Sequence, residues 1–250
     1  MNIEMPQTTQ PLRRLWKEAF GDEDDFLDGF FSSGFSPERC RCATENGKLL
    51  GALYWFDVRL QEQKYAYIYA VATAENSRGR GVCHALMAKT HSDLKAQGYS
   101  GSILVPQSEG LFRFYGGMGY VPCSWVREYV CSAGEASVPV RAVSAQEYAA
   151  QRRQLLPLGG IVQEGENLDF LQTQWKLYAG EDFLLTAFLQ KDKLIAMEYL
   201  GDPSHCRGIL RALNCSRGIF RMPGEDIPFA MYLPFEKGSK KPAYFGLAFD

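Results

Sequence analysis

The sequence predicts an α/β protein in which a mixed, mostly antiparallel sheet is flanked by helices. Two observations lead to this fold class. Strand-like apolar runs occur in pairs around short turns such as Asn46-Gly47, with amphipathic segments before and after them. In addition, the apolar run from Tyr67 to Ala72 enters a short turn rich in glycine and arginine, and an amphipathic segment follows from Val82. The local order there is strand, glycine loop and helix.

Size and composition set limits on the function. The 250 residues allow one large domain or two small ones, and a net charge of −2 gives no basic excess for nucleic acid. No apolar run approaches the ~20 residues of a membrane span, and the N-terminus lacks the pattern of a signal peptide. The seven cysteines therefore predict reduced thiols in the cytoplasm. We expect no nucleic-acid or membrane partner and leave a homo-oligomer open.

The first half begins with two predicted helices. Thr9 can cap the first, Pro11 suits its first turn, and Gly21 ends it. The carboxylates at 22–25 suit the N-terminus of the second helix, where the helix dipole is positive. The elements expected next are strands at 40–45, 49–60 and from 65, a helix from 82 to about 97, a strand at 101–105, a short helix after Ser108, and strands at 121–123 and 125–131.

The glycine loop is suited to an anion. The first amides of a helix have no intrahelical partner, and the helix dipole adds positive charge there. Gly79 and Gly81 allow a close approach to the backbone, and Arg78 and Arg80 add charge. The loop is neither a Walker A motif, because no Gly-Lys-Ser/Thr follows, nor a dinucleotide fingerprint, because the third glycine is missing. Taken alone, the loop leaves the phosphate ligand open.

Two segments together resemble a known family. Residues 76–81, Asn-Ser-Arg-Gly-Arg-Gly, resemble the acyl-CoA loop Q/R-x-x-G-x-G/A of the GNAT superfamily of N-acyltransferases, with Asn76 in place of Gln or Arg. Residues 108–120 resemble the family segment N-x-x-A-x-x-x-Y-x-x-x-G-F/Y, with Ser108 for Asn and Leu111 for Ala. They lie at the distance that the family expects, and the resemblance extends over about residues 8–131.

The resemblance implies a GNAT fold and direct transfer of an acetyl group from acetyl-CoA, without a metal, to a primary amine of a small molecule or peptide. Tyr115 matches the tyrosine that protonates the leaving thiolate, although its spacing alone also suits a core residue. The positions that match cofactor-binding residues are Val71, Ala72, Thr73, Arg78, Gly79, Arg80, Gly81, Val82 and Ser108.

The general base has no direct match in the family pattern. Many GNAT enzymes carry a Glu on or near the cofactor strand, but residues 65–73 contain no acid. Two other carboxylates are candidates: Asp57 on the strand before it and Glu109 on the short helix after Ser108. Enzymes of the enhanced-intracellular-survival type use a C-terminal carboxylate, so Asp250 is the second expected catalytic residue, with a solvent-facing chain end as the alternative.

The second half is predicted to repeat the layout without the loop. We expect a GNAT domain at 1–133, a linker at 134–142, and a degenerate GNAT-like domain at 143–250, as in tandem-domain GNAT proteins. At Gly201-Asp202-Pro203, where a loop would fall, the acidic side chain is unfavourable for phosphate. The expected elements are helices at 144–155 and 167–178, a hairpin at 183–189 and 194–200, a helix from 203, and strands at 218–222, 229–234 and 244–248.

Alternatives remain at this point. The chain could be a catalytically weak acyl-CoA-binding protein with a GNAT fold, or a nucleotide-binding protein that uses the loop for another phosphate. His84 and His91 share a helix face, but core or surface histidines suit the pattern better than a metal site. We expect the pairs Arg152-Arg153 and Lys240-Lys241 to be solvated.

Overall fold

The computed structural model describes residues 1–249, which form two compact units. The first unit is Met1–Val121 together with Met231–Lys240, and the second is Pro122–Ala230 together with the chain from Lys241 onward. The domains predicted at 1–133 and 143–250 stay a prediction. The units differ from them because 122–132 belongs to the second unit and 231–240 to the first.

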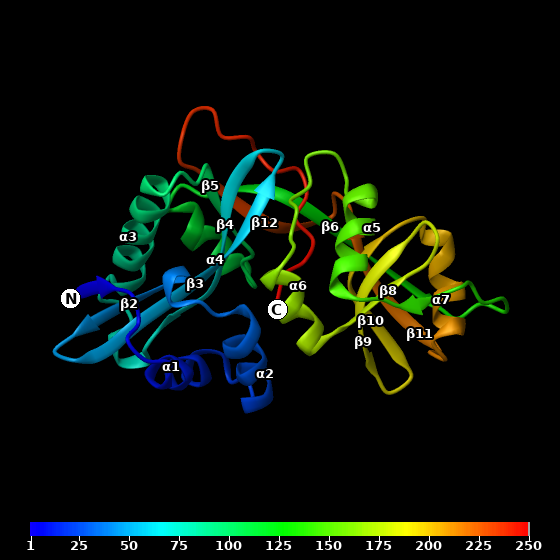
Figure 1. The fold of residues 1–250 in the computed structure, drawn as a ribbon, viewed down its shortest axis with the longest axis horizontal. Helices are drawn as coiled ribbons and strands as arrows, with labels where there is room; N and C mark the ends of the chain where they lie inside the picture. Colours follow the sequence, from blue (N-terminus) through cyan, green and yellow to red (C-terminus); the bar gives the residue numbers. More distant parts are fainter. Residues whose placement is uncertain (250) are drawn as a thin grey trace. The chain divides into compact units, whose positions relative to one another are not determined.

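The first unit contains the helices and strands predicted up to the short helix after Ser108, in the predicted order (Figure 1). Its elements are β1 (Asn2–Glu4), α1 (Gln10–Phe20), α2 (Asp24–Gly29), the π-helical turn η1 (Phe30–Gly34), η2 (Pro37–Arg39), β2 (Cys40–Glu45), β3 (Lys48–Leu60), β4 (Gln63–Thr73), η3 (Glu75–Ser77), α3 (Val82–Ala96), β5 (Gly101–Leu104) and α4 (Glu109–Gly116). The strand order is β1-β2-β3-β4-β5, and Met231–Pro234 of β12 (Ile227–Pro234) lies next to β5. Only the β4–β5 pairing is parallel among these described strands.

The two faces of β3 and β4 are covered by different helices. Alternate side chains of a strand point to opposite faces. Leu53 and Ile68 belong to the core cluster that includes the apolar side of α3 and Tyr115 of α4. Tyr54 and Tyr69 point the other way, where their rings contact Trp16 of α1. The sheet therefore separates the glycine loop and α3 from α1 and α2.

The second unit repeats this layout in part. Its elements are β6 (Val121–Ser132), β7 (Arg141–Ala142), α5 (Ala145–Leu155), α6 (Glu166–Gln174), β8 (Lys176–Ala179), β9 (Leu184–Gln190), β10 (Lys193–Leu200), η4 (Pro203–His205), α7 (Cys206–Ala212) and β11 (Arg217–Pro223). The strand order is β6-β11-β10-β9-β8-β7, with β10 and β11 parallel. The predicted capping box of α5 is confirmed, because Ser144 and Glu147 each bond the other's backbone N–H.

Several local predictions are wrong. The strand expected at 244–248 does not form, because side chains bond this backbone instead: Ser124 bonds Phe245 N–H at 3.0 Å and Gln163 bonds Leu247 N–H at 3.3 Å. The helix expected at 167–178 ends at Gln174, since the next residues pair with β9 as β8. The strands expected at 121–123 and 125–131 are one strand, β6. Thr9 precedes α1 without a side-chain cap.

No helix within residues 1–249 is long and apolar enough to cross a membrane.

Candidate functional site

The glycine loop forms the start of α3, as the sequence predicts. Gly79 and Gly81 both have left-handed backbone conformations, with φ of 76° and 77°. Side chains other than glycine rarely adopt this region, so these two glycines set the path of the loop. Gly81 is the N-cap of α3, and Ala85 N–H donates the first helical bond to its carbonyl at 3.0 Å. The loop therefore turns the chain sharply from β4 into α3.

The amides at this helix start have no intrahelical acceptor. They belong to Val82, Cys83 and His84, which precede the first helical donor, Ala85. A helix of 15 residues adds its dipole at the same end. The arrangement is suited to an anion such as a pyrophosphate.

The two arginines of the loop are placed differently from each other. Arg78 is exposed. Arg80 donates to Glu45 at 2.7 Å, so its guanidinium lies on β2. Both side chains of this pair are at least one-third exposed, at 50% and 35%. Such a pair contributes about 0–1 kcal/mol, so Arg80 can exchange Glu45 for a bound phosphate at little cost.

β4 contains a bulge close to its end. Ala52 pairs with Ala72 and Tyr54 with Tyr69, so Leu53 faces two residues of β4, Ala70 and Val71. Ala70 has φ of +47°, which costs about 1–2 kcal/mol outside glycine. Strained backbone of this kind is concentrated at functional sites.

β4 also has an unpaired edge. Its parallel pairing with β5 extends over Tyr65–Tyr67, while β4 itself continues to Thr73. Within the described residues, the edge of β4 away from β3 therefore has no strand partner beside Val71, Ala72 and Thr73. Backbone groups on this edge can bond a ligand inserted between β4 and β5.

Tyr115 lies on α4, which Ser108 begins. The Ser108 side chain accepts from Leu111 N–H at 3.3 Å, so it serves as the helix cap. Tyr115 is 8% exposed and packs in the same core cluster as Val82 and Val71. Burial raises the pKa of Tyr115, and nearby Cys83 adds to the shift. The phenol is therefore protonated at neutral pH.

The candidate bases differ in their surroundings. Asp57 accepts from Tyr99 at 2.5 Å and pairs with Lys64 at 2.9 Å. It faces Ala66, five residues before Val71 on β4, which is a strand distance of about 16 Å. Glu109 is 95% exposed and pairs with Arg113 at 3.6 Å. Neither carboxylate lies at the bulge. Asp250 lies outside the described residues.

Three polar side chains form a hydrogen-bonded group next to the end of α4. The Tyr120 hydroxyl is 2.6 Å from Ser102 Oγ and 2.9 Å from His91 Nε2. Burial lowers the pKa of His91 to about 4, so this ring is neutral at pH 7. His84, by contrast, is exposed against Phe114. No group of three metal-ligating side chains is found among the described residues.

The second unit has no loop at the corresponding place. Asp202 caps the short turn η4 by accepting from Ser204 N–H at 2.8 Å, so a carboxylate occupies this helix start. The helix that follows, α7, has only 7 residues.

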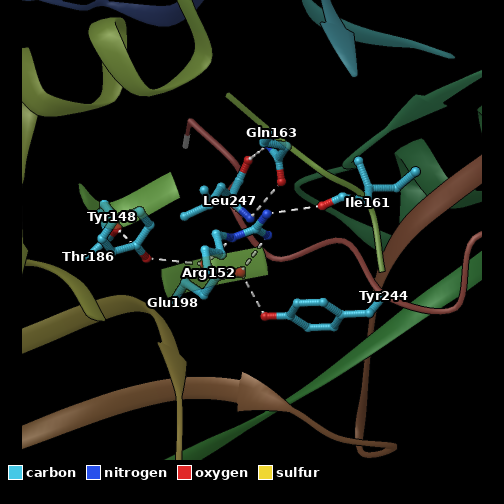
Figure 2. Close-up of polar contacts among 8 residues, drawn as sticks. All are labelled: Tyr148, Arg152, Ile161, Gln163, Thr186, Glu198, Tyr244 and Leu247. Carbon is cyan, nitrogen blue, oxygen red and sulfur yellow. Dashed lines mark hydrogen bonds and ion pairs between the residues drawn. The ribbon is translucent and has the colours of Figure 1, made fainter. Parts of the chain in front are cut away.

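A buried ion pair in the second unit was not predicted (Figure 2). Arg152 on α5 donates to both carboxylate oxygens of Glu198 on β10, at 2.8 and 2.9 Å, and to the Ile161 carbonyl at 3.0 Å. The hydroxyls of Tyr148 and Tyr244 donate to the same carboxylate at 3.2 and 3.0 Å. Burial lowers the pKa of Arg152, but Glu198 more than offsets this and raises it. The expectation that Arg152 is solvated is wrong, because the residue is 2% exposed.

This ion pair holds the C-terminal segment within its unit. Tyr244 belongs to that segment, and three residues later the Leu247 carbonyl accepts from Gln163 at 2.6 Å. Gly246 lies between them, and a Cβ there would be 2.1 Å from Glu198 Oε1. A glycine is required for the backbone to pass so close to the carboxylate. No local sequence signal marks these partners, since Arg152 and Glu198 are 46 residues apart.

Comparisons with known proteins agree with this geometry. Residues 6–123 match the model of an acetyltransferase (GNAT) domain. No curated protein is significantly similar to the chain in sequence. Among solved structures, a probable N-acyltransferase of unknown function from Enterococcus faecalis V583 is 16% identical, with a TM-score of 0.71 over 93% of this chain and 72% of that one.

Two further structures extend the likeness. Eis1 from Mycobacterium abscessus is 13% identical, with a TM-score of 0.66 over 90% of this chain and 67% of that one. A tandem GNAT protein from the clavulanic acid biosynthesis pathway is 9% identical, with a TM-score of 0.54 over 93% and 98%. At these identities the likeness concerns the fold. Residues 6–123 therefore match a GNAT acetyltransferase domain, and most of the chain shares the fold of these solved proteins.

Proposed function

We propose that the protein is an N-acetyltransferase that moves an acetyl group directly from acetyl-CoA to a primary amine. One observation carries this proposal. Three features meet in the core of the first unit: a helix start with unbonded amides, a bulged strand with an open edge, and the protonated Tyr115. Each suits one need of acyl transfer from a thioester.

The proposed roles follow from these positions. The amides from Gly79 to Val82 bind the pyrophosphate of the co-substrate beside the exposed side chains of Arg78 and Arg80, and Gly79 and Gly81 let it approach. A backbone N–H of β4 within Val71–Thr73, on the edge away from β3, polarises the acyl carbonyl as charge develops on its oxygen. Ser108 supports the site by capping the helix that carries Tyr115.

The reaction balances without a metal or an oxidant. The amine nitrogen forms a bond to the thioester carbon, and the carbon–sulfur bond breaks. The departing sulfur takes a proton from the Tyr115 hydroxyl, and the nitrogen loses its proton to a base, for which we propose the Asp250 carboxylate. Cys83 is not needed as an acyl carrier, since burial raises the pKa of this thiol to about 11 and disfavours the thiolate.

The function is tested with purified protein and an amine panel. We expect acetyl-CoA and CoA, but not ATP, to raise the melting temperature, and thiol release to depend on an added amine. Stabilisation by acetyl-CoA without thiol release across the panel would favour an acyl-CoA-binding protein instead. Stabilisation by ATP alone would favour a nucleotide-binding protein.

Tyr115→Phe separates catalysis from binding. We expect kcat to fall by roughly 10²- to 10⁴-fold, because the leaving sulfur loses its acid, while the Kd for acetyl-CoA stays unchanged. Tyr129→Phe is the matched control, since this tyrosine is 37% exposed in the second unit. Unchanged turnover in Tyr115→Phe would remove this residue from the mechanism.

Deletion of Asp250 tests the base. We expect kcat/KM to fall and its pH dependence to shift upward, because more of the amine must lose its proton to water. Normal turnover at every pH would show that the terminal carboxylate has no catalytic part. We also propose a cytoplasmic location, which the unpaired thiols of the described cysteines support.

A further inference from the structure

Aromatic rings cover the face of β3 and β4 opposite α3. Trp16 of α1 lies at the centre, 4.7 Å from the ring of Phe30, 5.2 Å from Tyr54 and 5.6 Å from Tyr69. Trp16, Phe30 and Tyr54 are buried, so this part of the cluster is ordinary core. We call the rings at its margin, Phe31, Phe35 and Tyr69, the aromatic margin.

The aromatic margin differs from the core in its exposure. Its three rings are only partly buried, although each contacts a core ring. Phe31 lies in the π-helical turn η1, which Phe35 N–H closes by bonding the Phe30 carbonyl at 2.9 Å. π-Helical turns are rare and occur frequently at functional sites. The turn brings Phe31 and Phe35 within 5.0 Å of each other.

The aromatic margin ends at the bulge. Tyr69 directly precedes Ala70, the strained residue next to the proposed carbonyl-binding amides. The glycine loop and α3 are on the opposite face of this strand. A co-substrate bound by that loop leaves the partly exposed margin of the aromatic face for the second substrate.

The charge around the aromatic margin suits an amine. The segment Arg13–Asp28 contains six acids and three bases, a net charge of −3, and two of the acids are paired within it: Asp28 with Arg13 at 2.5 Å and Asp24 with Lys17 at 2.6 Å. A cation already lies on one of the rings, because the Arg13 guanidinium is 4.9 Å from the centroid of Phe31. Ring faces attract cations, and apolar groups pack well on ring edges.

We propose that the aromatic margin selects the acceptor: a primary amine whose amino group is attached to an apolar, ring-sized group. The ring of the acceptor packs on Phe31 and Phe35, and its ammonium is attracted by the net negative charge of the segment Arg13–Asp28. This inference rests on the proposed acetyl transfer. It excludes polyamines and small hydroxylated amines as preferred acceptors, because their polar groups would lose water against the rings.

The test compares 2-phenylethylamine, ethylamine, ethanolamine and spermidine as acceptors with acetyl-CoA. We expect kcat/KM for 2-phenylethylamine to exceed that for ethylamine by roughly 10- to 100-fold. Phe31→Ala should reduce this ratio to near one without changing the Kd for acetyl-CoA, and Phe31→Leu should reduce it in part. Tyr129→Ala, which removes an exposed ring of the second unit, should leave the ratio unchanged.

Binding of the amines to the CoA-loaded protein is measured by calorimetry in parallel. Tighter binding of 2-phenylethylamine than of ethylamine, with the difference lost in Phe31→Ala, would support the inference. If this binding preference is found but no amine is acetylated, the result would contradict the proposed acetyl transfer and not the inference. Equal binding of the two amines, a preference for spermidine or ethanolamine, or an unchanged ratio in a folded Phe31→Ala variant would overturn it.

Discussion

Replacing Arg152 with methionine tests what the buried ion pair contributes to the second unit. The change leaves Glu198, which is 0% exposed, with two tyrosine hydroxyls and no positive partner. Removing one member of a buried ion pair costs about 3–5 kcal/mol, because the other charge stays buried and uncompensated. A chain of this size loses roughly 2–4 °C of melting temperature per kcal/mol, so a fall of about 6–20 °C is expected.

The neighbouring residue provides the control. Arg153 also bonds a glutamate through two nitrogens, but its side chain is 63% exposed and its partner is Glu164. An exposed pair contributes about 0–1 kcal/mol, so Arg153→Met should change stability little. The double variant Arg152→Met with Glu198→Leu should be more stable than Arg152→Met alone, because no unpaired charge is left.

Equilibrium urea unfolding followed by far-UV circular dichroism measures these differences. Two transitions are fitted where the two units unfold separately. A free energy of unfolding for Arg152→Met within 1 kcal/mol of that for Arg153→Met would refute the reasoning. It would mean that Glu198 is not left as a buried, uncompensated charge in the variant.

Two further predictions concern the first unit. Gly81→Ala should weaken acetyl-CoA binding measured by calorimetry, because a Cβ at φ of 77° costs about 1–2 kcal/mol and moves the loop amides. The control is Gly21→Ala, which carries the same strain at φ of 76° at the end of α1 and should leave the Kd for acetyl-CoA unchanged. Equal Kd values in both variants would contradict the role of the loop. The pKa of His91 is about 4 in the folded protein and 6.5 in the unfolded chain, so the unfolded chain binds more protons between these pH values. The free energy of unfolding should therefore fall by up to about 3 kcal/mol as pH falls from 6.5 to 4. His91→Gln should show less of this acid loss in urea unfolding, and an identical pH profile would be evidence against a buried neutral ring.

Local chemistry made much of the first unit predictable. Asn46 and Gly47 have φ of 50° and 74°, as a tight hairpin turn requires. Gly79 and Gly81 lie where the strand, loop and helix pattern put them, and Ser108 caps α4. In each case the residue type itself determines the backbone shape, so neighbours in sequence carry the information.

Distant partners were not predictable in the same way. Arg152 and Arg153 are identical in residue type and adjacent on α5, and only the fold decides that the first meets Glu198 inside the unit. The bulge at Ala70 depends on the register between β3 and β4, which no turn residue marks. The pairing of Met231–Pro234 with β5 joins segments far apart in sequence, and such pairings have no local signature.

The place of β12 affects how the first unit can form during synthesis. A nascent chain that has emerged through residue 133 contains the glycine loop, α3 and α4, but β5 still lacks the four residues that pair with it. Translation at about 5–20 residues per second takes roughly 5–20 s to reach Met231 from there. During that interval the edge of β5 is open to other strands, including those of neighbouring nascent chains. The first unit is therefore encoded first but completed nearly last.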